Sequence, residues 1–320
     1  MNPARFSKPD PSPLSGVAFA LTAFLIWGAS PVYWKVLGDV PALEIISHRM
    51  VWSFLFLLPL LWWQGRWSEF IGVLRKPRAV ALLLLTALLV ATNWLLYIWA
   101  VNHDLVLQAS LGYYINPLVN VILGALCLGE RLRRFQYGAV LLAGAAVVYL
   151  TVSLGRYPWV SLTLAVTFGI YGLIRKTVAV GALVGLQVET ALLSLPALAY
   201  LGALQAAGTA AFAAGGPRIS FFLTGSALVT ALPLLCFSLG ARRLTLASLG
   251  FLQYVAPSCM FLLGVLVYEE PFSAAQVKTF LMIWAALAVY SLDSALFYRR
   301  HAAASGLTRP SPALTRGARK

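Results

Sequence analysis

Charged residues are scarce in this chain. Of its 320 residues, 11% are charged and 60% are hydrophobic, and the mean hydropathy is +0.82. Soluble domains carry about 25% charged residues. A single water-soluble core of this composition is excluded, because the buried core of a domain grows more slowly than its chain. The composition therefore predicts a membrane protein, with the lipid bilayer as its surroundings.

Cysteine is also scarce, and its spacing carries no motif. Cys127, Cys236 and Cys259 all lie inside apolar runs, without a CxxC or a Cys/His ligand pattern. This arrangement argues against a disulfide framework and against a metal site. We interpret the three residues as small packing residues, and we expect no metal and no cofactor.

Motifs for catalysis and phosphate binding are missing. The chain contains no GxSxG, no HExxH, no Walker loop and no GxGxxG followed by an acidic residue. An enzyme is therefore not expected, and any pumping must use a solute or ion gradient. The net charge of +14 does not indicate nucleic-acid binding, because the basic residues form short runs between apolar blocks.

Ten apolar segments are long enough to be candidate membrane spans, since a span needs about 20 mostly apolar residues. The polar residues 1–13 before them are expected to be a cytoplasmic tail, and residues 299–320 after them a disordered cytoplasmic tail. The ten expected spans cover residues 14–37, 42–63, 79–101, 106–128, 136–154, 159–175, 183–204, 219–240, 245–268 and 273–298.

Basic residues are distributed unequally between the two sides of these spans. With the N-terminus inside, about 19 of the 24 Lys and Arg residues fall in inner segments. Only Arg156, Arg218 and Lys278 fall in outer segments, and Lys35 and Arg49 lie within spans. The excess of inner positive charge predicts that both termini are cytoplasmic.

One stretch occurs twice. ASLGYYINPLVNVILGALCLGERL starts at Ala109, and ASLGFLQYVAPSCMFLLGVLVYEEPF starts at Ala247, with the prolines Pro117 and Pro257 at an offset of 140. Residues 14–154 and 159–298 are therefore expected to be two five-helix repeats. Because five is odd, the second repeat must cross the membrane in the opposite sense. The predicted fold is an all-α membrane protein of ten transmembrane helices in two inverted repeats, an architecture typical of transporters.

The second span carries three ionisable residues. Glu44 and His48 share a helical face, and Arg49 lies about 12 Å past Pro41, near the midplane. A charge at the bilayer centre costs about 2.5–3.5 kcal/mol, so these groups should face the interior. We interpret them as a solute-binding and possible proton-binding cluster. An internal ion pair that fixes helix packing is the alternative.

Glu189 lies at an offset of 141 from His48 and is the acidic residue placed well inside the spans of the second half. We predict that His48 and Glu189 provide proton linkage, and a structural hydrogen bond from Glu189 to the second span is the alternative. A solute cavity is expected to be lined by the polar residues of the third and fourth spans. Interhelical hydrogen bonding is the alternative for each of them. These residues are Asn93, Tyr97, Tyr113, Tyr114 and Asn116.

Pro117 and Pro257 are hinge candidates, because proline removes a helical hydrogen bond and permits a kink, and a bent helix that packs well is the alternative. Glu130 and Glu270 stand just before the fifth and tenth spans, where we expect each carboxylate to favour the N-terminus of the next helix. Lys35 is expected to be a flanking residue whose ammonium reaches the membrane surface.

The paired stretches resemble the EamA branch of the drug/metabolite transporter superfamily, and within it the RarD family. LIWGASPVYWK, EIISHRMVWS and FGIYGLIRK add to the resemblance, which runs from about Leu14 to Tyr298. It implies ten helices in two EamA repeats, a location in the bacterial inner membrane, and efflux or exchange of small organic solutes. RarD proteins are associated by name with chloramphenicol sensitivity, which does not establish a substrate here.

The predicted function is a secondary transporter, an exporter of a small organic metabolite or drug that works by alternating access, with proton coupling as a candidate driving force. Arg49 is expected to bind an anionic group of the solute. The alternative is a non-transporting membrane subunit or a signalling or assembly protein, and a membrane-embedded enzyme would need a cluster that the sequence lacks.

Overall fold

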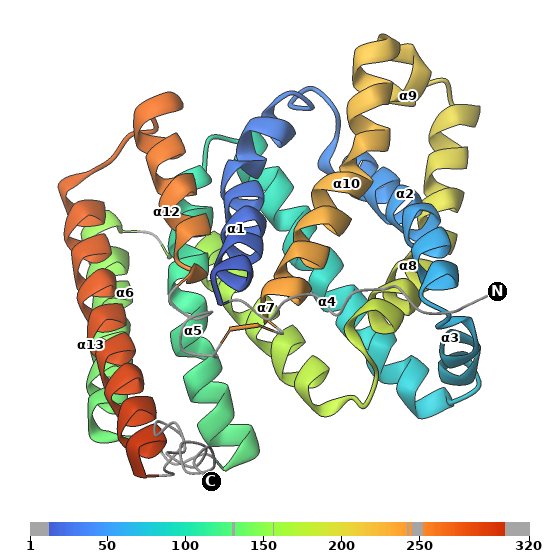
Figure 1. Ribbon diagram of the computed structural model, residues 1–320. Coiled ribbons are helices and arrows are strands. Elements are labelled where there is room, and N and C mark those ends of the chain that lie inside the picture. Colours follow the sequence, from blue (N-terminus) through green and yellow to red (C-terminus); the bar gives the residue numbers. More distant parts are fainter. Residues whose placement is uncertain (1–12, 130–131, 156, 242, 245–251, 305–320) are drawn as a thin grey trace, which may run out of the picture.

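The computed structural model describes the chain except residues 1–12, 130–131, 156, 242, 245–251 and 305–320. All regular elements of the described part are helical (Figure 1). They are α1 (Pro13–Lys35), α2 (Ala42–Trp63), α3 (Trp67–Leu74), α4 (Pro77–Asn102), α5 (Val106–Leu128), α6 (Arg134–Leu154), α7 (Trp159–Thr177), α8 (Ala182–Ala206), α9 (Ala211–Ala214), α10 (Gly216–Ala241), α12 (Val255–Leu262), the π-helix η1 (Leu263–Val267) and α13 (Ala274–Ala304).

Eight of the described helices are long and apolar enough to cross a membrane, namely α1, α2, α4, α5, α6, α8, α10 and α13. Two shorter apolar helices, Trp159–Arg175 and Val255–Val267, lie where the sixth and ninth spans were expected. Most expected boundaries agree within three residues. The ninth differs most, since its helix begins at Val255 and residues 245–251 lie outside the described part.

Two features of the described chain differ from expectation. The tail was expected to be disordered from residue 299, but α13 continues to Ala304, because the RRHAAA segment has high helix propensity. The connection between the second and third expected spans contains the short helix α3, which the search for membrane spans did not predict. Phe70 and Val73 of α3 are buried and pack with apolar residues of α4 and α8, which stabilises this short helix.

Apolar and polar side chains are distributed as in a membrane protein. Leu141 and Phe221 are 71% and 73% exposed, whereas the side chains of Arg49, Asn93 and Glu189 are buried. In water this distribution would be unfavourable, because apolar side chains would contact solvent and polar side chains would lose it. In a bilayer, the apolar surface faces lipid and the polar groups contact one another inside the bundle. The protein is therefore a multi-pass membrane protein.

The helices pack in pairs that cross between the two halves. α1 lies against α10 and α12, and α7 lies against α4 and α5. α2 contacts α8 and α10, and α8 also contacts α4. α6 and α13 lie side by side at one edge of the molecule, and α2, α3 and α8 lie at the opposite edge (Figure 1). The interior of the bundle is thus built from both halves.

The two hinge candidates occupy different positions. Pro117 lies in the interior of α5, which remains one helix from Val106 to Leu128. Pro257 lies in the first turn of α12, just after a turn at Gln253 and Tyr254. A proline clashes with the carbonyl four residues before it, which for Pro257 is that of Gln253, so the helix restarts there. The two prolines match in sequence without being equivalent in structure.

Some glycines allow two helices to approach closely. A Cβ added to Gly112 of α5 would lie 2.7 Å from the carbonyl oxygen of Ser161 in α7. A Cβ added to Gly144 of α6 would meet nothing within 4 Å. Small residues at such crossings are typical of helix packing in membranes, where van der Waals contact drives association.

Gly112→Ala is therefore expected to destabilise the protein, because the added methyl must separate α5 from α7. The expected loss is about 1–3 kcal/mol, measured as the free energy of unfolding in detergent or bicelles. Gly144→Ala is the matched control. It is expected to be neutral or to stabilise by up to about 1 kcal/mol, because alanine is the better helix former. Equal effects of the two substitutions would contradict the packing argument.

Candidate functional site

Arg49 lies inside the bundle on α2 and is 5% exposed. Its guanidinium carbon is 3.8 Å from the ring centroid of Trp94 on α4 and 5.2 Å from that of Trp34 on α1. Its Nε donates a hydrogen bond of 2.7 Å to Oγ1 of Thr230 on α10. Helices of both halves therefore fix one cation between two aromatic rings.

Arg49 has no carboxylate partner within ion-pair distance among the residues that the structure describes. Its neighbours in electrostatic effect are instead the neutral phenols of Tyr33, Tyr97 and Tyr113. The hydroxyls of Ser30 and Tyr97 are hydrogen-bonded at 2.7 Å. We refer to Arg49, Trp34, Trp94, Thr230 and these tyrosines as the Arg49 cluster. It presents a positive charge with aromatic walls, which suits a small anion with an apolar body.

Asn93 lies next to this cluster, and its amide and that of Asn116 form hydrogen bonds with other residues of the protein. Nδ2 of Asn93 donates to the carbonyl oxygen of Leu164 and to Oγ1 of Thr167, each at 2.9 Å. Nδ2 of Asn116 donates to the carbonyl oxygen of Ala165 at 3.0 Å. Both side chains therefore join α7 to helices of the first half, which supports the alternative of interhelical hydrogen bonding.

Tyr113 and Tyr114 point to different parts of the bundle. The Tyr113 hydroxyl donates to Oδ1 of Asn93 at 3.4 Å, within the central region. The Tyr114 hydroxyl is hydrogen-bonded at 2.6 Å to Ser258 of α12. It lines a separate cavity of about 470 Å³ between α5, α12 and α13, with Trp284 among its walls. The polar residues of the fourth span therefore do not line a single cavity.

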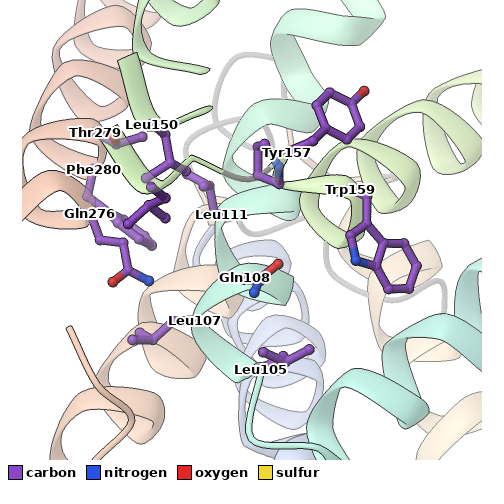
Figure 2. A pocket seen from close by; sticks show the side chains of 12 residues that line it. Leu105, Leu107, Gln108, Leu111, Leu150, Tyr157, Trp159, Gln276, Thr279 and Phe280 are labelled. Carbon is purple, nitrogen blue, oxygen red and sulfur yellow. The ribbon is translucent and has the colours of Figure 1, made fainter. Parts of the chain in front are cut away.

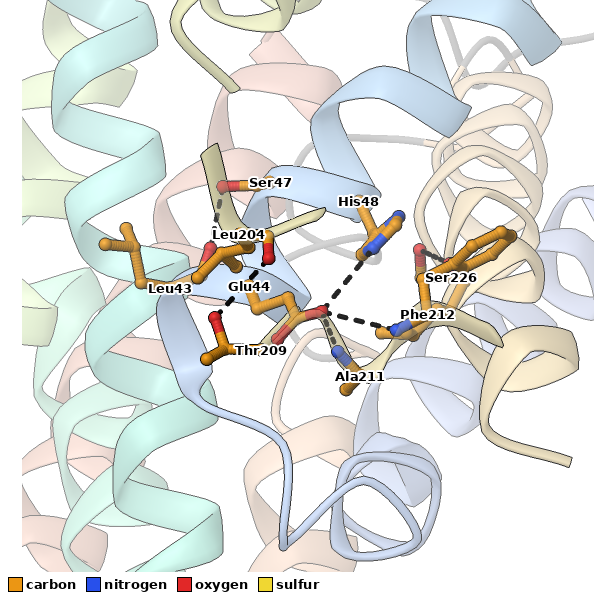
Figure 3. Close-up of polar contacts among 10 residues, drawn as sticks. Leu43, Glu44, Ser47, His48, Leu204, Thr209, Ala211, Phe212 and Ser226 are labelled. Atoms are coloured by element: carbon orange, nitrogen blue, oxygen red, sulfur yellow. Dashed lines mark hydrogen bonds and ion pairs between the residues drawn. The ribbon is translucent and has the colours of Figure 1, made fainter. Parts of the chain in front are cut away.

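Glu44 and His48 lie at the end of the bundle where α1 ends and α2 begins (Figure 3). Oε1 of Glu44 accepts the backbone N–H of Ala211 at 2.7 Å and of Phe212 at 3.4 Å. Nε2 of His48 is 4.0 Å from Oε1 of Glu44, and its ring stacks on Phe212 with centroids 5.0 Å apart. This nitrogen is buried and has no hydrogen-bond partner in the described part.

Glu189 lies on α8 near the opposite end and forms an ion pair. Nε of Arg175 is 3.7 Å from its Oε1, and Thr86 of α4 donates to the same oxygen at 2.7 Å. Oε2 of Glu189 and Nη1 of Arg175 are buried and have no hydrogen-bond partner among the described residues. Thr86 of the third span is thus the partner, whereas the sequence suggested the second span.

Glu270 binds a helix N-terminus, although not the expected one. Its Oε1 and Oε2 accept the N–H groups of Val106 at 2.6 Å and Leu107 at 2.9 Å, at the start of α5. The next helix in the chain, α13, was the expected partner. Burial raises the pKa of the Glu270 carboxyl, and the two amide donors oppose this rise. Glu130, the matching residue of the first half, lies outside the described residues.

Lys35 differs from a simple flanking lysine. Its ammonium pairs with Asp104 in the connection between α4 and α5, and lies 5.1 Å from the ring centroid of Tyr268. It therefore contacts both halves.

A further cavity, of about 150 Å³, lies between α5, α6, α13 and the start of α7 (Figure 2). Gln108, Gln276 and Thr279 are its polar lining residues among mostly apolar ones. It does not include Arg49, so we do not assign it to the central site. No group of three potential metal ligands occurs in the part of the chain that the structure describes.

Sequence reasoning found Arg49 but not its surroundings. Trp34, Trp94 and Thr230 come from three different helices, and their spacing along the chain gives no signal that they meet. Arg175 was interpreted only as an inner flanking charge. Its position, 14 residues before Glu189 on the preceding helix, was the available signal for the pair.

Comparisons with known proteins agree with these features. The model of the EamA-like transporter family matches residues 14–152. An "uncharacterized transporter" of Vibrio cholerae serotype O1 is 49% identical over 90% of this chain and 96% of its own length. "Protein RarD" of Escherichia coli K12 is 43% identical, over 89% of this chain and 96% of its own length. The "chloramphenicol-sensitive protein RarD" of Pseudomonas aeruginosa is 32% identical, over 90% and 97%.

A solved crystal structure shares the fold. It superposes with a TM-score of 0.54 at 21% sequence identity, and the match covers 88% of this chain and 98% of that chain. The buried polar centre, the membrane-type surface and the relatives lead to one conclusion: this chain belongs to the EamA-like transporter family, among RarD-like proteins.

Proposed function

We propose that this protein is a secondary transporter that exports a small organic anion across the bacterial inner membrane by alternating access. The observation that carries the proposal is the buried guanidinium of Arg49, which has two aromatic walls and no carboxylate partner in the described part. A buried cation without a counter-ion is costly, and an anionic solute would provide one.

We also propose that the two halves are related by inverted symmetry. Exchanging each span with the one five places later turns the pair α1–α10 into α7–α4, and turns α1–α12 into α7–α5. It also turns α2–α10 into α8–α4, while α2–α8, α5–α12 and α6–α13 each map onto themselves. Contacts of this kind support two equivalent halves around a central site, where rocking exposes the site to each side in turn.

We further propose that both termini are cytoplasmic and that transport is coupled to protons. The excess of Lys and Arg in the inner segments supports cytoplasmic termini, which places Lys35 and Glu44 at the outer end and Arg175 and Glu189 toward the inner end. His48 and Glu189 occupy matching positions, and each has a buried atom without a hydrogen-bond partner in the described part. Proton linkage through these two residues is therefore retained as a proposal.

Purified protein in liposomes is expected to transport a small carboxylate with an apolar or aromatic body faster than an amine of the same size. The reason is that Arg49 attracts anions and repels cations. Radiolabelled compounds of both kinds are measured as counterflow, with and without an imposed pH gradient. Protein-free liposomes are the control. The proposal fails if no organic anion moves under any gradient, and its charge selectivity fails if amines move faster.

A further inference from the structure

Two buried glutamates at the outer end each join one half of the protein to the other. Glu44 of the first half accepts N–H groups of Ala211 and Phe212 in the second half (Figure 3). Glu270 of the second half accepts the first two N–H groups of α5 in the first half. The two glutamates are 1% and 7% exposed. We refer to these four hydrogen bonds as the outer bridges.

The backbone holds Glu270 in place for this contact. η1 ends at Val267, and Glu269, two residues further along the chain, has a left-handed φ of 48°. The N–H of Tyr268 donates to the carbonyl of Leu263, and that of Glu270 to the carbonyl of Gly264, each at 2.9 Å. A left-handed residue with such hydrogen bonds is a common way to end a helix. The carboxylate of Glu270 is therefore directed at α5 by the termination of its own helix.

Other contacts between the halves lie at the same end. The ammonium of Lys35 lies over the ring of Tyr268, and the Tyr33 hydroxyl donates to the carbonyl oxygen of Phe222 on α10. The outer end is thus closed by residues of both halves.

At the inner end, the residue that matches Glu44 carries no carboxylate. At the offset of 141, Glu44 corresponds to Gly185 on α8. The space where a side chain of residue 185 would begin is filled by the guanidinium of Arg175, which turns toward Glu189 of the same half. Residue 185 therefore supplies no carboxylate counterpart to Glu44, and among the described residues this contact is a feature of the outer end.

We propose that Glu44 and Glu270 are the closing residues of the outer gate, and that release of solute to the outside requires the outer bridges to break. This inference rests on the transport function proposed above. In this proposal, Glu44 and Glu270 hold the two halves together at the outer end, whereas Arg49 binds the solute. A hydrogen bond to a charged group favours the closed arrangement by about tenfold or more.

The response of the gate to pH has a defined sign. Lys35 of α1, Asp104 of the α4–α5 connection and Tyr268 are the ionisable groups that interact with Glu270. Burial raises the pKa of this carboxyl in the closed arrangement, whereas in an open, hydrated gate the pKa returns toward its ordinary value. Protons therefore bind more tightly to the closed state, and acidification favours closure rather than opening.

The experiment measures access to the centre from outside. Cys127, Cys236 and Cys259 are replaced by alanine, and Ser30→Cys introduces one thiol beside Tyr97, about 7 Å inward from Lys35 along α1. A membrane-impermeant thiol reagent is added to spheroplasts at constant pH. Glu44→Ala and Glu270→Ala are each expected to raise the labelling rate about tenfold, because unpaired amides destabilise the closed gate. The Gln variants retain one acceptor oxygen and are expected to have smaller effects.

Glu69→Ala is the matched control, because Glu69 of α3 pairs with Arg66, which lies just before that helix and away from the outer end. Its labelling rate is expected to equal that of the parent. Size-exclusion chromatography shows which variants fold, and a Gln variant replaces an Ala variant that does not. Unchanged labelling in folded variants of both glutamates would overturn the gate. Failure of the parent to transport any organic anion would instead overturn the proposed function, since labelling does not depend on transport.

Discussion

Replacing Arg49 with methionine is expected to lower solute binding and transport by about 10- to 100-fold, while the stability of the empty protein changes by less than about 1 kcal/mol. The loss of function follows from the loss of the charge-assisted hydrogen bonds that the guanidinium offers to an anion. Stability is preserved because Arg49 forms no ion pair with a carboxylate in the described part, so its replacement leaves no buried carboxylate without a partner.

The near-neutral effect on stability comes from opposing contributions. Arg49 interacts with Trp34 and Trp94, and such cation–π contacts contribute up to about 2 kcal/mol when desolvated. Burial of the charge opposes this, and methionine removes the charge while keeping an unbranched side chain between the two rings. A residue that evolved for packing would behave differently, because its removal would lower stability.

Both quantities are measured on the same preparations. Counterflow of a transported carboxylate gives function, and unfolding in detergent monitored by tryptophan fluorescence gives stability. Arg66→Met is the control, because Arg66 is a half-buried arginine paired with Glu69 outside the bundle centre, and only small effects are expected. A large loss of stability in Arg49→Met, with binding per folded molecule unchanged, would identify Arg49 as a structural residue.

Replacing Arg175 with methionine is expected to destabilise the protein by about 3–5 kcal/mol. Arg175 is the basic partner of Glu189, whose side chain is 1% exposed. Without the guanidinium, the carboxylate keeps the hydrogen bond from Thr86 but loses its counter-ion in a nonpolar environment. Removing one member of a buried pair is therefore costly.

The double variant Arg175→Met, Glu189→Met separates this explanation from simple loss of packing. Two apolar side chains leave no unpaired charge, so the double variant is expected to recover most of the lost stability. The measurement is the free energy of unfolding of the parent, both single variants and the double variant. Additive losses, with the double variant less stable than either single variant, would show that the two side chains contribute independently and would contradict the explanation by an unpaired charge.

The two arginines show why their roles could not be assigned from the sequence. Arg49 was placed near the midplane by counting residues from Pro41, and the structure agrees that it is buried. Arg175 was only counted, with Lys176, among the basic residues of the inner segments. Only contacts between helices show that the first lacks a carboxylate in the described part and that the second has one.

The partners of Glu270 and Glu44 also could not be predicted from the sequence. The sequence indicated that Glu270 would interact with a helix N-terminus, because carboxylates favour the positive end of a helix. Its partner proved to be α5, which is more than 160 residues away in the chain. Glu44 was expected near the solute, but it binds backbone amides of Ala211 and Phe212. Such partners depend on how the two halves pack, and no local pattern encodes this.

The sequence by itself determined that this chain crosses a membrane many times, where most helices begin and end, and that Glu44, His48, Arg49 and Glu189 lie inside. These properties follow from hydrophobicity and chain length, because the bilayer imposes a fixed thickness and satisfies no polar groups. Only the tertiary structure decided which helices meet, that Tyr113 and Tyr114 face different regions, and which partners Arg49, Glu189 and Glu270 have. Inside the bundle, side chains find their partners across helices, so their contacts are set by packing between distant segments.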